Sequence, residues 1–322
     1  MAIAGTMCKL FAALLLGYLL NKQGIMDAHT SKRISAMITS IIMPLLIISS
    51  VAGISGDGGD VLKLFLAGVV CYALFPVIGW GVVRLMRIQV NLRGVYMCMV
   101  IFANNAFMGY PVVSALFGEE AIFYTTIFHL MFNLMFFSLG MILIRKDAGA
   151  GKKTEEEIAH AQIRPIRKWE RIRSVRQVLN NGVIASILAL VIYFSGIPLP
   201  SVVAETCGFI GNICMPLSMM VIGSSIAGYS IKDIFSEKKV YLIAVVRLMI
   251  MPLLVFFVMR LFTGDEELIK IATITVGMPI ASLVAMGAAP YQEQAKVASI
   301  SVLFTTLCSM ITIPVMCMLL GA

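Results

Sequence analysis

Charged residues are scarce in this chain. They make up 13% of the sequence, whereas soluble domains contain about 25%, and the mean hydropathy is +0.95. This composition excludes a soluble globular domain. The apolar runs are about 17 to 25 residues long, which is the length of a membrane-spanning helix, and they lack the period-two alternation of barrel strands. The chain is therefore predicted to be an all-α integral membrane protein.

Motifs for catalysis, metals and disulfides are also missing. The sequence contains no G-x-S-x-G, no H-E-x-x-H and no pair of intramembrane aspartates, so neither an enzyme nor a cofactor is predicted. The seven cysteines form no C-x-x-C pair and have no histidine cluster beside them, which argues against a disulfide framework and a metal site. The formal charge of +8 lies mostly in short loops between apolar runs, so nucleic-acid binding is not predicted either.

No Asp or Glu lies in the interior of any predicted span. A carboxylate-based relay for protons or sodium needs such a buried acid. The membrane interior instead offers Lys9, Arg247, His129 and several amides. The amino-terminal ends of broken helices would add positive dipole ends. An interior of this kind suits an anion.

Ten candidate spans can be counted along the chain. They cover residues 3–20, 34–53, 61–83, 95–118, 121–144, 182–197, 202–227, 240–261, 268–289 and 297–320. A long hydrophilic stretch separates them into two sets of five, so the predicted organisation is 1–144, a basic linker 145–181, and 182–322. Because each set holds an odd number of spans, the second set enters the membrane with the opposite orientation, and any repeat is inverted.

Matching landmarks favour such a repeat. Gly24 stands 20 residues before Pro44, as Gly196 stands 20 residues before Pro216, and each of these prolines lies in an MPL tripeptide. Corresponding landmarks recur in the same order at offsets of 168 to 176 residues. Each coincidence alone is weak because glycine and proline are frequent in membrane helices. Together they predict two related halves.

Lysine and arginine determine the predicted orientation. Of the 25 basic residues, 20 fall on the side that carries the linker 145–181, and the opposite loops hold seven acidic residues. The linker is therefore predicted to be cytoplasmic, with both termini outside the cell membrane. Apolar residues in the linker recur every three or four positions between basic ones. It is either an amphipathic helix on anionic membrane lipid or a solvated basic loop.

Two of the spans carry a matching interruption. In the first, 95–118, the segment GYPVVSALFG (109–118) aligns with GMPIASLVAMG (277–287) of the second, 268–289, allowing one extra residue. A proline within the membrane removes a backbone donor, and the break is tolerated only where protein or a water-filled cavity satisfies the freed groups. Matched breaks in two halves indicate a transporter's binding site. Ordinary proline kinks are the alternative, because five other prolines also lie in apolar runs.

The residues NNAFMGYP (104–111) resemble the N-x-x-F-x-G-x-P pattern of the auxin efflux carrier family, and residues 278–315 resemble its second signature. The resemblance covers nearly the whole chain. It implies ten transmembrane helices in two inverted five-helix repeats, with a scaffold domain and a transport domain. In the transport domain, two broken helices, spans four and nine, are expected to cross near Pro111 and Pro279. It also implies a homodimer and small organic anions as substrates, such as auxin, malate or malonate; the short linker favours a bacterial type.

The candidate substrate-binding residues flank the two breaks. They are Asn104, Asn105, Gly109, Pro111, Gly277, Pro279 and Ser282. An amide beside a chain break can donate to a carboxylate without the desolvation cost of a full charge, which favours Asn104 and Asn105. Hydrogen bonding between helices is the alternative for both amides.

Arg247 and His129 are candidates for a proton or charge role. Arg247 lies inside span eight, where an unpaired guanidinium is costly. It either contacts the substrate or a carbonyl cluster, or it extends to the inner headgroups. His129 in span five is either a proton carrier or a hydrogen-bonded structural residue, with Asn133 one turn away as a candidate partner.

The sequence therefore predicts a secondary active transporter of a small organic anion that works by alternating access. A proton or sodium is a candidate coupling ion, and uncoupled transport is also open. One alternative is a sodium-coupled organic-anion or bile-acid-type symporter. Another is a transporter-like membrane sensor, which would bind a ligand without moving it.

Overall fold

The protein is described from a computed structural model. The structure describes residues 2–52, 58–148, 181–196, 198–235, 237–288 and 291–321. The predicted amphipathic segment of the linker lies outside these residues. Within them every regular element is helical, apart from one isolated bridge between Ala103 and Ile280. The prediction of an all-α chain is confirmed.

The described part of the first half contains eight α-helices and four shorter helical turns. They are α1 (Ala2–Lys22), α2 (Ala28–Met37), η1 (Ile38–Ile42), α3 (Met43–Ser49), α4 (Gly58–Leu85), η2 (Val90–Leu92), α5 (Arg93–Ile101), η3 (Asn105–Gly109), α6 (Tyr110–Phe117), α7 (Ala121–Met135), η4 (Phe136–Gly140) and α8 (Met141–Ala148). The turn η2 is a 3₁₀ turn, whereas η1, η3 and η4 are wider π turns.

The described part of the second half is also helical. Its elements are α11 (Asn181–Ser195), α12 (Ser201–Gly211), α13 (Cys214–Ala227), α14 (Ile231–Ile234), α15 (Lys238–Val245), the π turn η5 (Val246–Ile250), α16 (Met251–Phe262), α17 (Glu266–Val276), α18 (Ser282–Ala288) and α19 (Gln292–Leu320).

Among the described residues, six helical stretches are long and apolar enough to cross a membrane. They are Ala28–Ser49, Gly59–Leu85, Ala121–Lys146, Ser201–Ala227, Lys238–Phe262 and Glu293–Leu320. The two spans predicted to be broken, 95–118 and 268–289, are not among these six stretches, because each is divided into shorter helices. The chain is a multi-pass membrane protein, and its broken segments depend on the surrounding helices to satisfy their backbone groups.

Three of the π turns precede a proline. Pro44, Pro111 and Pro252 each lie at the second position of the α-helix that follows η1, η3 or η5. A proline ring in a helix clashes with the carbonyl four residues earlier and cannot donate to it. In all three cases that carbonyl belongs to the π turn, whose wider geometry relieves the clash without ending the helix.

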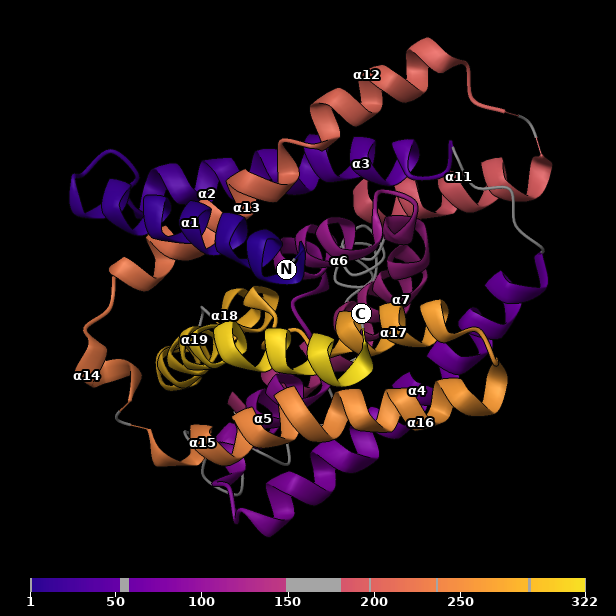
Figure 1. Cartoon of the computed structure of the whole chain (residues 1–322). Helices are drawn as coiled ribbons and strands as arrows, with labels where there is room; N and C mark the ends of the chain where they lie inside the picture. Colours follow the sequence, from indigo (N-terminus) through magenta and orange to yellow (C-terminus); the bar gives the residue numbers. More distant parts are fainter. Residues whose placement is uncertain are drawn as a thin grey trace, which may run out of the picture.

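The helices gather into two groups, which meet around the breaks (Figure 1). In one group, α1 packs on α13, and α3 packs on α11 and α12. In the other, α4 packs on α5, α7 and α16, while α16 packs on α17 and α18 packs on α19. The turn η3 and α6 contact both α13 and α7. The first broken segment therefore lies where the two groups meet.

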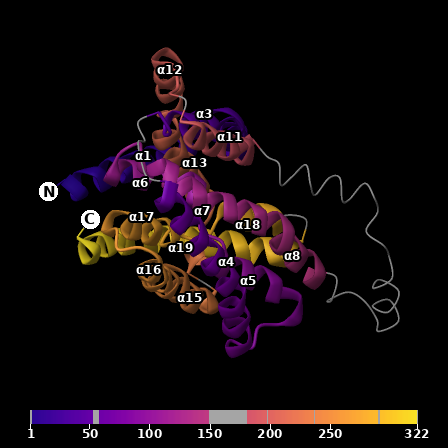
Figure 2. The same cartoon turned by 90° about the vertical axis from the view of Figure 1, so that its right-hand side faces the viewer.

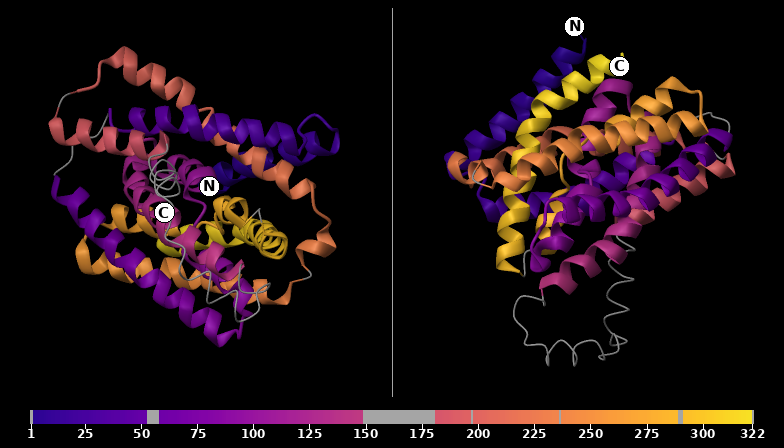
Figure 3. Two further views of the ribbon diagram at one scale, coloured as in Figure 1. Left: turned by 180° about the vertical axis from the view of Figure 1, so that it is seen from behind. Right: turned by 90° about the horizontal axis from the view of Figure 1, so that it is seen from below.

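The two termini lie near each other at one end of the molecule, and α8 ends at the opposite end (Figures 2 and 3). This arrangement agrees with termini on one side of a membrane and the linker on the other. Which side is outside remains a prediction from the basic residues.

Candidate functional site

The two helix breaks contact each other directly. The backbone N–H of Asn104 donates to the carbonyl of Pro279 at 2.8 Å, and the N–H of Ala281 donates to the carbonyl of Phe102 at 2.9 Å. These bonds flank the antiparallel bridge between Ala103 and Ile280. The short extended segments thus satisfy each other's backbone groups, as an interruption inside a membrane requires.

The contact lies at a slightly different place from the predicted one. Pro279 takes part in it through its carbonyl, whereas Pro111 lies seven residues beyond Asn104, at the start of α6. The reason is that Asn104 and its two predecessors, not the proline, leave the helix. Pro111 instead lies within a continuous helical stretch, where the π turn η3 relieves the clash of its ring with the carbonyl of Phe107.

Thr305 on α19 completes the backbone pairing of the second break. Its hydroxyl accepts from the N–H of Ile280 at 3.2 Å and donates to the carbonyl of Ser301 at 2.8 Å. Thr305 is fully buried. The sequence analysis did not single it out, because a threonine in a span usually bonds only to its own helix.

Thr305→Val is expected to lower the free energy of unfolding by about 1–3 kcal/mol, since it leaves the N–H of Ile280 buried without a partner. The measurement is the melting temperature of the purified protein in detergent. Thr306→Val is the matched control, because the hydroxyl of Thr306 donates to the Val302 carbonyl within the same helix. Equal melting temperatures for the two variants would contradict the assigned bond.

Arg247 forms hydrogen bonds to the backbone of both breaks. It is fully buried and donates to the carbonyls of Val100, Met278 and Val276, the first two at 2.9 and 3.2 Å. Of the alternatives drawn from the sequence, extension to the headgroups is wrong, and contact with a carbonyl cluster is confirmed. Arg247 lies in the π turn η5, which directs it into the protein instead of toward lipid.

Asn104 and Asn105 are buried beside the contact, with 3% and 1% of their surfaces exposed. The Nδ2 atoms of both have no hydrogen-bond partner among the described residues, and neither has Oδ1 of Asn105. Neither Nδ2 donor has a well-aligned acceptor on a neighbouring helix of the described part of the chain, although the side chain of Asn105 lies near the hydroxyl of Tyr72 on α4. Buried amide donors without partners are rare in native proteins, and they mark a place where a ligand or water belongs.

His129 lies on α7 close to the first break. Its ring packs edge-on against Tyr110, with 5.5 Å between centroids, and stacks on Phe132 at 5.4 Å. The ring atom Nδ1 has no hydrogen-bond partner among the described residues. The amide of Asn133 donates to the backbone carbonyl of His129 at 3.0 Å. Nδ1 of His129 is thus free to bind a proton or a hydrogen-bond donor, although aromatic rings surround the imidazole.

The remaining predicted residues surround the contact in different ways. Gly109 donates its N–H to the carbonyl of Asn104 at 3.0 Å, and its α-carbon faces Met278, where an added Cβ would fit at 3.6 Å. At Gly277 an added Cβ would lie 2.4 Å from the end of the Met316 side chain. Ser282 is the first residue of α18 and is half-buried. The structure therefore groups Asn104, Asn105 and Gly109 with the second break.

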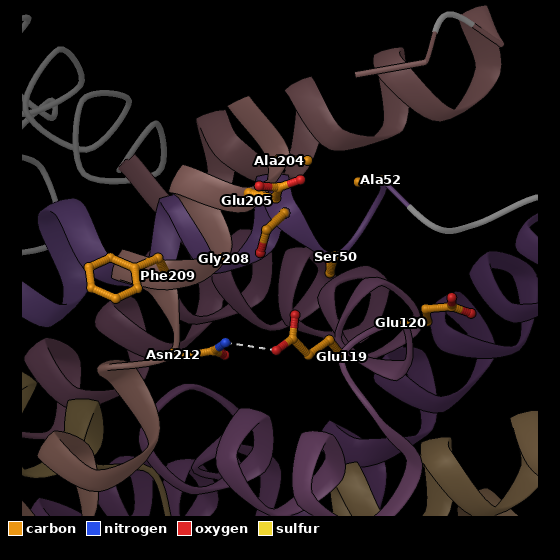
Figure 4. A pocket seen from close by; sticks show the side chains of 10 residues that line it. Ser50, Ala52, Glu119, Glu120, Ala204, Glu205, Gly208, Phe209 and Asn212 are labelled. Carbon is orange, nitrogen blue, oxygen red and sulfur yellow. Dashed lines mark hydrogen bonds between the residues drawn. The ribbon is translucent and has the colours of Figure 1, made fainter. Parts of the chain in front are cut away.

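A cavity of about 490 Å³ lies apart from the breaks, between α3, α12 and the turn before α7 (Figure 4). Its lining includes Glu119, Glu120 and Glu205, and the amide of Asn212 donates to Glu119 at 2.7 Å. A smaller void also lined by Asn212 reaches Tyr110 and Pro111. This cavity could not be predicted from the sequence, because Glu119 and Glu120 lie in the turn before α7 whereas Glu205 lies on α12, far away in the chain. Three carboxylates disfavour an anion there, so the breaks remain the candidate site.

No group of three His, Cys, Asp or Glu residues that could hold a metal occurs in the described part of the chain. The arrangement of paired helix interruptions with unfilled amide donors is that of a membrane transport protein. The family described as "Membrane transport protein" matches residues 2–317, and the chain belongs to this family, that of the auxin efflux carriers.

A relative from Methanothermobacter thermautotrophicus is described as an uncharacterized transporter. It is 21% identical to this chain over 312 residues, which cover 96% of the chain and 95% of the relative. The family predicted from the motifs at 104–111 and 278–315 is thereby confirmed, and transport across a membrane is the general function that it supports.

Proposed function

We propose that this protein is a secondary active transporter of a small organic anion, such as a carboxylate, which binds beside the contact between the two helix breaks. The observation that carries the proposal is the pair of buried amides, Asn104 and Asn105, whose Nδ2 donors have no partner among the described residues. Leaving such groups unpaired costs about 1–3 kcal/mol each. A bound carboxylate would accept from these donors and remove that cost.

The charge around the breaks supports an anion. Arg247 places a cation against the breaks, and its hydrogen bonds to Val100, Val276 and Met278 keep it there. No carboxylate of the described residues forms an ion pair with Arg247. Near Asn104 no acidic side chain of the described residues therefore opposes a negative ligand, in a region from which water is largely excluded.

The helix packing supports the proposal of ten transmembrane helices in two inverted repeats of five. If α11 corresponds to α1 and α12–α13 to α2–α3, the contact of α1 with α13 has its equivalent in the contact of α11 with α3. The contacts α4–α5 and α6–α7 have their equivalents in α16–α17 and α18–α19. Each half thus repeats the neighbour relations of the other.

This arrangement supports the proposal of alternating access. The group of α1, α2, α3, α11, α12 and α13 serves as a scaffold, and the group that holds both breaks moves against it. The boundary between the two groups, here called the seam, runs where η3 and α6 contact α13. We place the protein in the cell membrane with both termini outside, and we propose that it is a homodimer. His129, near the seam, is the proposed site for a coupling proton.

Counterflow in proteoliposomes tests this function. Protein reconstituted with labelled malate, malonate or indole-3-acetate is expected to exchange at least one of them faster than empty liposomes, and an uncharged amide analogue is expected to fail. Sodium replacement and a pH series then identify the coupling ion. Strict sodium dependence would support the symporter alternative. Binding of an anion without flux would support the sensor alternative and overturn the proposal.

A further inference from the structure

Arg247 is a permanent cation that is fully buried, and no acidic partner for it occurs among the described residues. A charge in such a place is costly unless it is neutralised. Its partners are three backbone carbonyls that come from both helix breaks: Val100 near the end of α5, Val276 at the end of α17, and Met278 in the break itself.

Two of these carbonyls, those of Val100 and Val276, lie at the negative ends of helices. The last carbonyls of a helix have no partner within it, and each helix end carries roughly −0.5 of an elementary charge. The ends of α5 and α17 together therefore roughly balance one guanidinium. In carriers coupled to a cation, unwound carbonyls and the ends of half-helices are the groups that bind the ion. In this chain Arg247 already donates to those groups.

The shape of the guanidinium allows it to bind several carbonyls at once. Its planar fork directs separate N–H groups to carbonyls on two chain segments, whereas a lysine presents one compact point charge. The three bonds use Nε, Nη1 and Nη2 of the same side chain. Arg247 also lies in the π turn before Pro252, so the irregular backbone of η5 aims it at the breaks.

We propose that Arg247 is a resident cation that replaces a coupling alkali ion in this transporter. It holds the two breaks together through their carbonyls, so that transport proceeds without sodium. Arg247 is thus a positioning residue: it acts through the backbone that carries Asn104 and Pro279. The statement about sodium rests on the proposed function, whereas the statement about the carbonyls does not.

The first test measures melting temperature without any substrate, so it is independent of the proposed function. Arg247→Ala in the full-length protein is expected to lower the melting temperature by roughly 10 °C, because three charge-assisted hydrogen bonds are lost. Added guanidinium chloride at millimolar concentration is expected to restore most of this loss, and tetramethylammonium chloride is not. Arg260→Ala is the matched control, since Arg260 lies on α16 and pairs with Glu266 at the surface.

Two further variants separate charge from volume. Arg247→Met keeps the volume without the charge, and Arg247→Lys keeps the charge without the fork. Both are expected to melt below the wild type, with Lys closer to it. A wild-type melting temperature for Arg247→Met would show that only packing matters and would overturn the proposal. Failure of guanidinium to restore Arg247→Ala, while Arg247→Met and Arg247→Lys melt alike, would also overturn it.

The second test measures counterflow with sodium replaced by choline. The wild type is expected to show the same rate in both, and Arg247→Met is expected to gain at least a threefold stimulation by sodium or another alkali cation. This gain of ion dependence is a readout that a merely structural side chain would not give. Loss of wild-type flux on sodium removal would overturn the proposal even if the anion transport itself is established.

Discussion

Gly223→Ala is expected to leave little folded protein in the membrane. A Cβ at this position on α13 would lie 1.8 Å from the carbonyl oxygen of Leu14 on α1, and at Gly17 it would lie 2.0 Å from the carbonyl oxygen of Met220. The backbones of the two helices thus touch at these glycines. Small residues allow such approach in membranes, where packing is the main force between helices.

The clash cannot be relieved by a side-chain movement, because the atoms that the Cβ meets are backbone. The helices must separate, which we expect to cost about 4 kcal/mol or more in the free energy of unfolding. The same result is expected for Gly17→Ala. The measurement is the yield of monodisperse protein after detergent extraction, followed by its melting temperature.

Gly81→Ala is the matched control for this prediction. Gly81 also lies in a long helix, α4, but a Cβ there meets nothing within 4 Å. Alanine is the better helix former by roughly 0.5–1 kcal/mol, so this variant should be as stable as the wild type or slightly more so. A Gly223→Ala protein that extracts and melts like Gly81→Ala would refute the close contact of α1 and α13.

Asn104→Ala is expected to reduce counterflow of the transported anion by roughly 10- to 100-fold. Hydrogen bonds to a charged group contribute about 1.5–3 kcal/mol, and each 1.4 kcal/mol is a factor of ten. The backbone bond from Asn104 to the Pro279 carbonyl is kept in this variant. The melting temperature without substrate is therefore expected to stay the same or to rise, since a buried donor without a partner has been removed.

That combination separates a binding residue from a structural one. Asn181→Ala is the matched control, because Asn181 is exposed and its amide donates to the Ser40 carbonyl at 2.7 Å, away from the breaks. It is expected to transport at the wild-type rate. Wild-type counterflow by Asn104→Ala, or a fall in its melting temperature that accounts for the lost flux, would remove Asn104 from the proposed site.

Much of the candidate site could be predicted from local pattern. The interruptions of 95–118 and 268–289 are visible as proline and glycine within apolar runs, and their repetition indicates that they belong together. The amides at 104 and 105 stand out because polar side chains are costly in a span. Pro111 was placed at the crossing because a proline marks a break, yet the residues that leave the helix are 102–104.

The hydrogen-bond partners of the buried polar groups could not be predicted from local sequence pattern. Thr305 was overlooked, and the acidic cavity lined by Glu119, Glu120 and Glu205 was unforeseen. For Arg247 the sequence allows contact with the substrate, contact with a carbonyl cluster, or extension to the headgroups. In each case the answer depends on residues far away in the chain; Arg247 and Val100, for example, are 147 positions apart.

The sequence by itself determined that this is an all-α membrane protein, where its helices are interrupted, and to which family it belongs. These properties follow from hydrophobic length, backbone chemistry and short motifs, all of which are local. Only the tertiary structure decided which residues of the two breaks pair with each other and that Arg247 binds the carbonyls of both. The reason is that a buried polar group is satisfied by whichever segment the packing of the other helices brings beside it.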